Sequence, residues 1–232
     1  MIKCISKVKA VLVLVLVICL NFSLCAHAES FILCDGFSYE DVSESLPLDI
    51  GQDVTNFEEN RYIRRKDLRL LNVQYVGFDD AVHNGQLVVA YEVKSPLTGE
   101  VINIAKEVLE IFKELFDKRY PIDEMSCFCF RNISGKRSLS WHAYGLAVDV
   151  NYHRNPCLIF GKRGRVIKTV PENLERYANR DLNEKGMIKV GDDCYNAFVC
   201  RGWEWGGSWD SPKDYMHFQK FPWDAPRPAA KY

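Results

Sequence analysis

Two short motifs in the second half of the sequence hold side chains that bind divalent metals. His142 and Asp149 lie in the segment 140–149, and His217 lies in the segment 214–218. Two imidazoles and one carboxylate are the protein ligands of a catalytic zinc site, whose fourth position is open to water. Gly145 permits a sharp bend between the first two residues, so their side chains can converge. We therefore predict one Zn²⁺ ion bound by His142, Asp149 and His217.

A zinc hydrolase also needs a base that takes a proton from water and returns it to the leaving group. Asp214, three residues before His217, is the natural candidate. On one continuous strand these two side chains would face opposite sides, so Asp214 must lie in a turn before the strand that carries His217. The composition of residues 210–213 is typical of such a turn. Glu204 is the alternative base.

Two further polar residues could orient a substrate at this site. Arg131 offers a fixed cation for a developing oxyanion or a substrate carboxylate, and Ser140 lies two residues before His142. Together with Asp214 they complete the predicted catalytic set. A different interpretation stays open, in which the histidines are satisfied core residues and Asp149 forms a salt bridge.

Hydrophobic periodicity predicts the elements that position these residues. Residues 70–76 and 87–93 are predicted strands, separated by a turn at residues 83–86 that contains Asn-Gly. Thr98 can cap a helix that ends before Pro121. The apolar face of that helix consists of Val101, Ile104, Ala105, Val108, Phe112 and Leu115. Residues 144–152 alternate as a strand that places Asp149 on the face opposite Val148. The sequence therefore predicts an α+β fold in which a helix packs on a sheet.

The first residues of the chain predict export. A basic end, an apolar run at residues 10–25 and small residues at 26 and 28 form a signal peptide, residues 1–28. The run is shorter than the ~20 residues of a spanning helix, so we expect cleavage and no remaining membrane span. The mature protein is then secreted or held in the periplasm or cell envelope. Residues 29–65 form an acidic extension that we expect to be loosely ordered, and we expect residues 66–232 to form the domain that carries the predicted zinc site.

Composition and cysteine number set the class of protein. The 232 residues are 47% hydrophobic and carry a formal charge of −1, which is typical of a globular domain. This charge leaves no basic footprint for nucleic acid. Removal of residues 1–28 leaves six of the nine cysteines, an even number that predicts disulfides in an exported chain. Their pairing stays open, and we expect a monomer.

The ordered motifs resemble those of a known family. They are Ser-x-His-x-x-Gly-x-Ala-x-Asp at 140–149, Gly-Trp-x-Trp-Gly-Gly-x-Trp at 202–209 and Asp-Tyr-Met-His-Phe at 214–218. All three are similar to motifs of the LAS zinc peptidases. The similarity covers roughly residues 66–222. It is closest to the branch of D-alanyl-D-alanine carboxypeptidases and L-alanyl-D-glutamate endopeptidases, which includes bacterial cell-wall enzymes and phage endolysins.

This resemblance implies an exported zinc metallopeptidase that hydrolyses a peptide bond in peptidoglycan stem peptides. It also implies a small α+β domain with helices packed on an antiparallel sheet. By this resemblance His142, Asp149 and His217 match the zinc ligands, Asp214 the acid/base, and Arg131 and Ser140 the substrate-orienting residues. Which bond is cleaved stays open. The alternative is a non-catalytic module of the same fold that keeps zinc and binds a cell-wall or protein partner.

Overall fold

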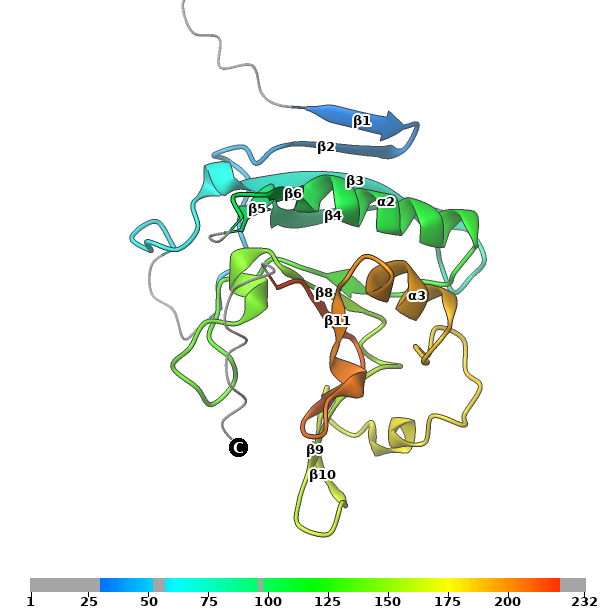
Figure 1. Ribbon diagram of the computed structural model, residues 1–232. Helices are drawn as coiled ribbons and strands as arrows, with labels where there is room; N and C mark the ends of the chain where they lie inside the picture. Colours follow the sequence, from blue (N-terminus) through cyan, green and yellow to red (C-terminus); the bar gives the residue numbers. More distant parts are fainter. Residues whose placement is uncertain (1–29, 52–56, 96–97, 222–232) are drawn as a thin grey trace, which may run out of the picture.

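Two four-stranded antiparallel sheets and one long helix form the framework of the molecule (Figure 1). The computed structural model describes residues 30–51, 57–95 and 98–221. The first sheet has the strand order β1-β2-β3-β4. Its strands are β1 (Phe31–Cys34), β2 (Phe37–Asp41), β3 (Leu68–Val76) and β4 (Val82–Ala90). The expected α+β class is therefore confirmed.

The helix α2 (Ile104–Asp117) packs against the first sheet and against the short helix α3 (Asp193–Val199). The Asn103 side chain caps α2 by accepting a hydrogen bond from the Lys106 backbone nitrogen at 2.8 Å. The predicted Thr98 cap is wrong, because strand β6 (Val101–Asn103) pairs with β5 (Glu92–Lys94) before the helix begins. The buried face of α2 follows the expected helical period and consists of Ile104, Ala105, Val108, Leu109, Ile111, Phe112 and Leu115.

The second sheet, with the order β11-β13-β8-β7, carries two of the predicted metal ligands. Its strands are β7 (Met125–Ser126), β8 (Ala147–Val150), β11 (Glu204–Trp205) and β13 (His217–Gln219). A smaller sheet, β10-β9-β12, consists of β9 (Cys157–Phe160), β10 (Val166–Val170) and β12 (Lys213–Asp214). The 3₁₀ helices are η1 (Arg65–Asp67), η2 (Trp141–Tyr144), η3 (Glu175–Ala178) and η4 (Gly206–Ser208).

One apolar core joins α2 to both larger sheets. Leu71 of the first sheet, Phe112 of α2, and Val148 and Phe218 of the second sheet are fully buried in the same cluster. Burial of each such side chain stabilises the fold by ~1.5–3 kcal/mol. The sheet that carries the ligands is therefore held rigidly from behind.

Residues 31–50 belong to this fold, which corrects the expectation of a loosely ordered extension. Strand β2 pairs with β3, and Phe37 and Tyr39 are buried in the main core. Further along, Asp49 and Gly51 form backbone hydrogen bonds with Phe130. The acidic side chains of the segment lie on its exposed side, so its composition alone resembles that of a solvated spacer.

The predicted turn at residues 83–86 is also wrong. These residues lie within β4, which pairs with β3 from Val82 to Ala90, and the chain reverses at residues 77–81 instead. Gly85 has a packing role, because a Cβ at this position would come within 2.0 Å of the Met125 Cε. The Asn-Gly pair therefore reflects close packing on a strand and not a turn.

The predicted disulfides do not form in the described part of the chain, where the cysteines are free thiols: Cys34, Cys127, Cys129, Cys157, Cys194 and Cys200. The Cys127 thiol donates a hydrogen bond to the Ala147 backbone oxygen at 2.8 Å. Cys194 lies beside Tyr120, and Cys157 lies beside Asp214. These thiols contact groups other than a second cysteine. The disulfides predicted from the even number of cysteines are therefore not present in the described residues.

The predicted signal peptide, residues 1–28, lies outside the described residues. Among the helices that the structure describes, none combines the length and apolar character required to cross a bilayer.

Candidate metal centre

Two adjacent strands and one 3₁₀ helix bring the three predicted ligands together. Asp149 on β8 is directly paired with His217 on β13, so their side chains project from the same face of the sheet. His142 lies in η2, just before β8. Gly145 ends η2 at a φ of 66°, and a Cβ there would lie 2.4 Å from the Ala90 backbone nitrogen. This corner accepts only glycine, and it directs the chain from η2 into β8.

The ligand atoms converge on one point. His142 Nε2 lies 3.2 Å from Asp149 Oδ2 and 3.2 Å from His217 Nδ1. His217 Nδ1 lies 3.0 Å from Asp149 Oδ1. One ligand atom from each residue lies within 4.8 Å of the other two. That separation suits a single ion with bonds of ~2.0–2.2 Å to each atom.

Hydrogen bonds on the far side of each imidazole assign the nitrogen that faces the cluster. His142 Nδ1 donates to the Cys127 backbone oxygen at 2.5 Å. His217 Nε2 donates to Gln219 Oε1 at 2.9 Å, and Gln219 Nε2 donates in turn to Glu204 Oε2 at 2.9 Å. The inner nitrogens therefore present lone pairs toward the Asp149 carboxylate. Three acceptors at this separation need a cation among them, so the residues fit a metal ion.

The charges of the cluster are strongly coupled because the side chains are almost completely buried. Burial alone would raise the pKa of Asp149, but the two histidines hold it well below its usual range. Burial also acts to lower the pKa of His217, yet the hydrogen bond and charge of Asp149 raise it to about 9. The cluster therefore strongly favours a positive charge at its centre, supplied by protons or by a metal ion.

Asp214 lies beside this cluster on β12, and a turn at residues 215–216 separates it from β13. The prediction that Asp214 itself lies in a turn is therefore wrong, although the turn at residues 215–216 does keep Asp214 and His217 off one continuous strand. Its Oδ1 is buried and has no hydrogen-bond partner among the described residues. Burial raises the pKa of Asp214 to about 6, although His217 opposes the shift. Gly206 permits the close approach of η4, because a Cβ there would lie 2.6 Å from the Asp214 backbone oxygen.

Ser140 and Arg131 meet at the base of the loop formed by residues 132–139. Ser140 caps η2, and its Oγ accepts a hydrogen bond from the His142 backbone nitrogen at 3.3 Å. The Ser140 backbone nitrogen donates to the Arg131 backbone oxygen at 3.0 Å. The Arg131 side chain is half-buried, and its Nη1 donates to the Asn132 backbone oxygen at 3.4 Å. Ser140 therefore positions a predicted ligand directly, which its sequence motif alone does not indicate.

The sequence analysis missed two residues at the site. Gln219 is buried two residues after His217 on β13, so it shares the same face of the strand, and this period of two was a usable signal. Cys157 on β9 is paired with Asp214, and burial raises the pKa of its thiol well above the usual value. No local signal places Cys157 there, because the pairing of β9 with β12 joins distant parts of the chain.

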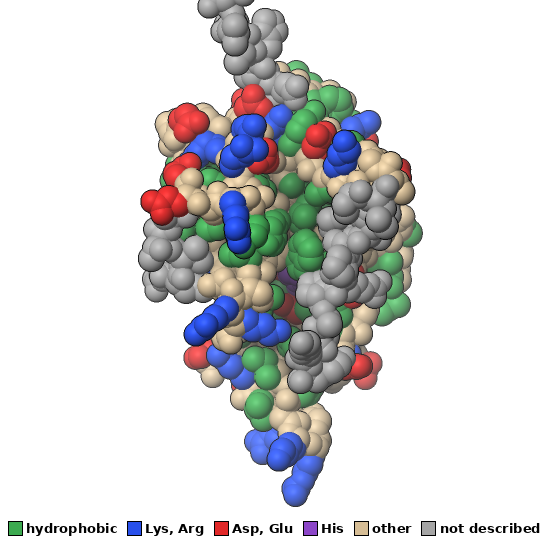
Figure 2. Space-filling view, turned by 60° about the vertical axis from the view of Figure 1, so that its left-hand side comes forward, with side chains coloured by type: hydrophobic (Ala, Val, Ile, Leu, Met, Phe, Trp, Pro, Cys, Tyr) green, Lys and Arg blue, Asp and Glu red, His purple; other side chains and the backbone are tan. Residues whose placement is uncertain are grey.

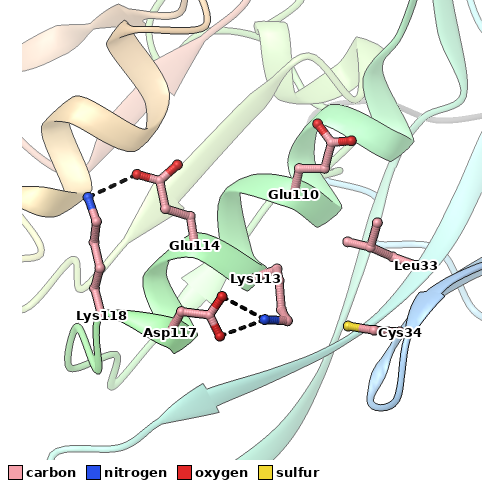
Figure 3. A pocket seen from close by; sticks show the side chains of 7 residues that line it. All are labelled: Leu33, Cys34, Glu110, Lys113, Glu114, Asp117 and Lys118. Atoms are coloured by element: carbon pink, nitrogen blue, oxygen red, sulfur yellow. Dashed lines mark hydrogen bonds and ion pairs between the residues drawn. The ribbon is translucent and has the colours of Figure 1, made fainter.

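A narrow recess opens on one face of the molecule. Figure 2 shows a histidine and an acidic side chain at the floor of a narrow hollow with hydrophobic side chains along its wall. A separate groove of about 500 Å³ lies between β1 and α2 (Figure 3). Four of its charged side chains pair with one another, Lys113 with Asp117 and Lys118 with Glu114. The groove contains none of the predicted site residues.

Comparison with known families confirms the resemblance to peptidases. Residues 134–220 match the family model described as D-alanyl-D-alanine carboxypeptidase. This segment contains the three predicted ligands as well as Ser140 and Asp214, whereas Arg131 lies just outside it. Over residues 134–220 the chain is thus similar to this peptidase family, and the structure adds a cluster of side chains that could hold a metal ion. Searches of curated proteins and of solved structures gave no match for the chain.

Proposed function

We propose that this protein is an exported zinc metallopeptidase that hydrolyses a peptide bond in peptidoglycan stem peptides. The proposal depends on Asp214, whose buried Oδ1 has no hydrogen-bond partner among the described residues and lies beside three side chains that could bind a metal. A purely structural metal site needs no such base. The family match over residues 134–220 supports the peptidase class. The signal-like pattern of residues 1–28 supports a location outside the cytoplasm, where this substrate is found.

Each residue of the site has a defined task in this reaction. His142, Asp149 and His217 would hold the ion, and two nitrogen donors with one carboxylate oxygen suit Zn²⁺. A bound zinc ion supplies Lewis-acid activation of water and of the scissile carbonyl. Asp214 takes a proton from the attacking water and later delivers it to the departing amine. In the metal-free protein, burial raises the pKa of Asp214 to about 6.

Arg131 and Ser140 organise the substrate side of the site. The Arg131 guanidinium can pair with a stem-peptide carboxylate or stabilise the oxyanion, and Ser140 holds η2 in place beside it. Both a carboxypeptidase and an endopeptidase lie within the proposal. A carboxypeptidase must capture the free terminal carboxylate, whereas an endopeptidase must leave that end of the recess open.

Metal analysis and mass spectrometry of products from defined stem peptides test the proposal. His142→Ala, Asp149→Ala and His217→Ala should each lose both bound zinc and hydrolysis. Asp214→Ala should keep zinc and lose turnover by roughly 10²–10⁴-fold, the usual contribution of a general base. A chelator should abolish activity, and added zinc should restore it. Zinc binding with no hydrolysis of any stem peptide would favour the non-catalytic module, and a folded protein that binds no metal would contradict the site.

A further inference from the structure

The β9–β10 hairpin concentrates positive charge at one end of the molecule. Residues 157–171 contain four basic residues and no acidic one, although the whole chain carries a formal charge of −1. The four side chains are exposed, and none forms an ion pair within the described part of the chain: Lys162, Arg163, Arg165 and Lys168. Unpaired cations gathered on one short segment are available to bind an anionic partner.

This hairpin projects away from the two larger sheets. Figure 1 shows its loop as the far end of the molecule, and Figure 2 shows that this end consists largely of basic side chains. The strands of the hairpin are antiparallel, and Gly161 and Gly164 lie in the loop that joins them. The cations therefore extend into solvent on an ordered support.

The base of the hairpin is part of the candidate active site. Strand β9 pairs with β12, so that Cys157 lies opposite Asp214 and Leu158 opposite Lys213. Arg163 lies six positions after Cys157, a span of up to about 20 Å at roughly 3.3 Å per strand residue. A ligand that contacts both the hairpin loop and Asp214 must therefore be a long molecule.

We propose that the β9–β10 hairpin is a docking arm for the carboxylate-bearing peptidoglycan polymer whose stem peptides enter the recess. This inference rests on the proposed function and assigns a surface outside the recess to the same substrate. A single polymer carries the scissile peptide and, on neighbouring stems, further carboxylates for the four cations. An anionic membrane would also attract these cations and the exposed Ile167. However, a membrane would not bring a peptide to Asp214, so the connection of the hairpin to the site favours the polymer.

Co-sedimentation with insoluble peptidoglycan tests this proposal. The full chain is compared with a hairpin variant in which Lys162, Arg163, Arg165 and Lys168 are all changed to Ser. The matched control removes the same charge from two exposed arginines and two exposed lysines elsewhere that form no ion pair within the described residues: Arg61, Lys66, Lys94 and Arg119. All three forms are also prepared with Asp214→Ala, so that the polymer stays intact during the measurement.

We expect the hairpin variant to bind the polymer roughly tenfold more weakly. Each of the four exposed cations forms only a weak ion pair with the polymer, so the loss of binding free energy is modest. Binding of the unmodified hairpin should weaken as salt is added. The control variant should bind like the unmodified chain, and kcat/KM on a short soluble stem peptide should be unchanged in the hairpin variant. Retained polymer binding by the hairpin variant, or equal losses in both variants, would overturn the proposal.

Two additional measurements separate this proposal from its alternatives. Hairpin-dependent binding to anionic lipid vesicles, with none to peptidoglycan, would overturn the polymer assignment in favour of a membrane. Hairpin-dependent binding to peptidoglycan by a protein that cleaves no soluble stem peptide would contradict the proposed function and still support the docking arm.

Discussion

At the scale of single residues, the direction of two hydrogen bonds decides whether His217 can bind a metal. The Glu204 carboxylate only accepts hydrogen bonds, so it draws the Gln219 amide nitrogen toward itself. Gln219 Oε1 is then left to accept the proton of His217 Nε2, and the lone pair of Nδ1 faces Asp149. Glu204, the alternative base in the sequence analysis, thus acquires a positioning role through Gln219.

Gln219→Leu should weaken zinc affinity by about 10–100-fold, the usual effect of removing the partner of a metal-binding histidine. Chelator competition measures this affinity independently of activity. Gln86→Leu, on the exposed part of β4, is the matched control and should leave zinc affinity unchanged. Glu204→Gln should also lower zinc affinity while the zinc-loaded variant keeps its turnover. Unchanged affinity with lost turnover in Glu204→Gln would instead make Glu204 the base.

Asp214 also links the site to stability, because its pKa of about 6 in the folded protein exceeds the ordinary 3.8. The folded state therefore binds this proton more tightly than the unfolded state. The resulting destabilisation is fully present above about pH 6 and disappears below pH 3.8. Asp214→Asn should raise the free energy of unfolding of the metal-free protein at pH 7 by up to about 3 kcal/mol.

Denaturant unfolding at pH 7 and near pH 4 measures this difference, which should shrink at the lower pH. Asp210→Asn changes an exposed carboxylate nearby and should have little effect at either pH. An Asp214→Asn variant no more stable than the unmodified protein at pH 7 would show that the Asp214 carboxylate is not destabilising.

At the scale of elements, regular periodicity made α2 and β8 predictable from the sequence. The apolar face of α2 repeats every three to four residues, and β8 alternates so that Asp149 faces away from the core side of Val148. Residues 83–86 were misassigned because Asn-Gly is a strong turn signal, whereas the reason for Gly85 is its contact with Met125 in a distant part of the chain. Such contacts have no signature in the local sequence.

The corner between η2 and β8 is the element that most directly fixes the ligand geometry. Gly145→Ala should destabilise the protein by at least about 2 kcal/mol and weaken zinc affinity. It combines left-handed backbone strain with a clash against the Ala90 backbone. Gly135→Ala is an informative control, because Gly135 has a φ of 74° and no atom within 4 Å of its would-be Cβ. It should show the strain alone, about 1 kcal/mol, with zinc affinity intact; equal effects of both changes would contradict a special role for the corner.

At the scale of the whole molecule, the site depends on a core to which the N-terminal segment contributes. The convergence of His142, Asp149 and His217 could be predicted because their side-chain types and ordered motifs are typical of one kind of metal site. The role of residues 31–41 could not, because the pairing of β2 with β3 crosses many residues and the segment is rich in acids. Phe37 and Tyr39 nevertheless lie in the same cluster as Val148, which neighbours Asp149 on β8.

This connection predicts that a change far from the recess lowers the stability of the whole domain. Phe37 is 1% exposed and packs edge-on against Phe116 with ring centroids 5.6 Å apart. Phe37→Ala should therefore destabilise the protein by about 3–5 kcal/mol, whereas Ile32→Ala, at a side chain 74% exposed, should change stability by less than about 0.5 kcal/mol. Unfolding should remain a single transition that includes loss of zinc, because one core connects β2 to the sheet of the site. A separate, early transition of residues 30–50 with the zinc site intact would show that this segment is an appended unit after all.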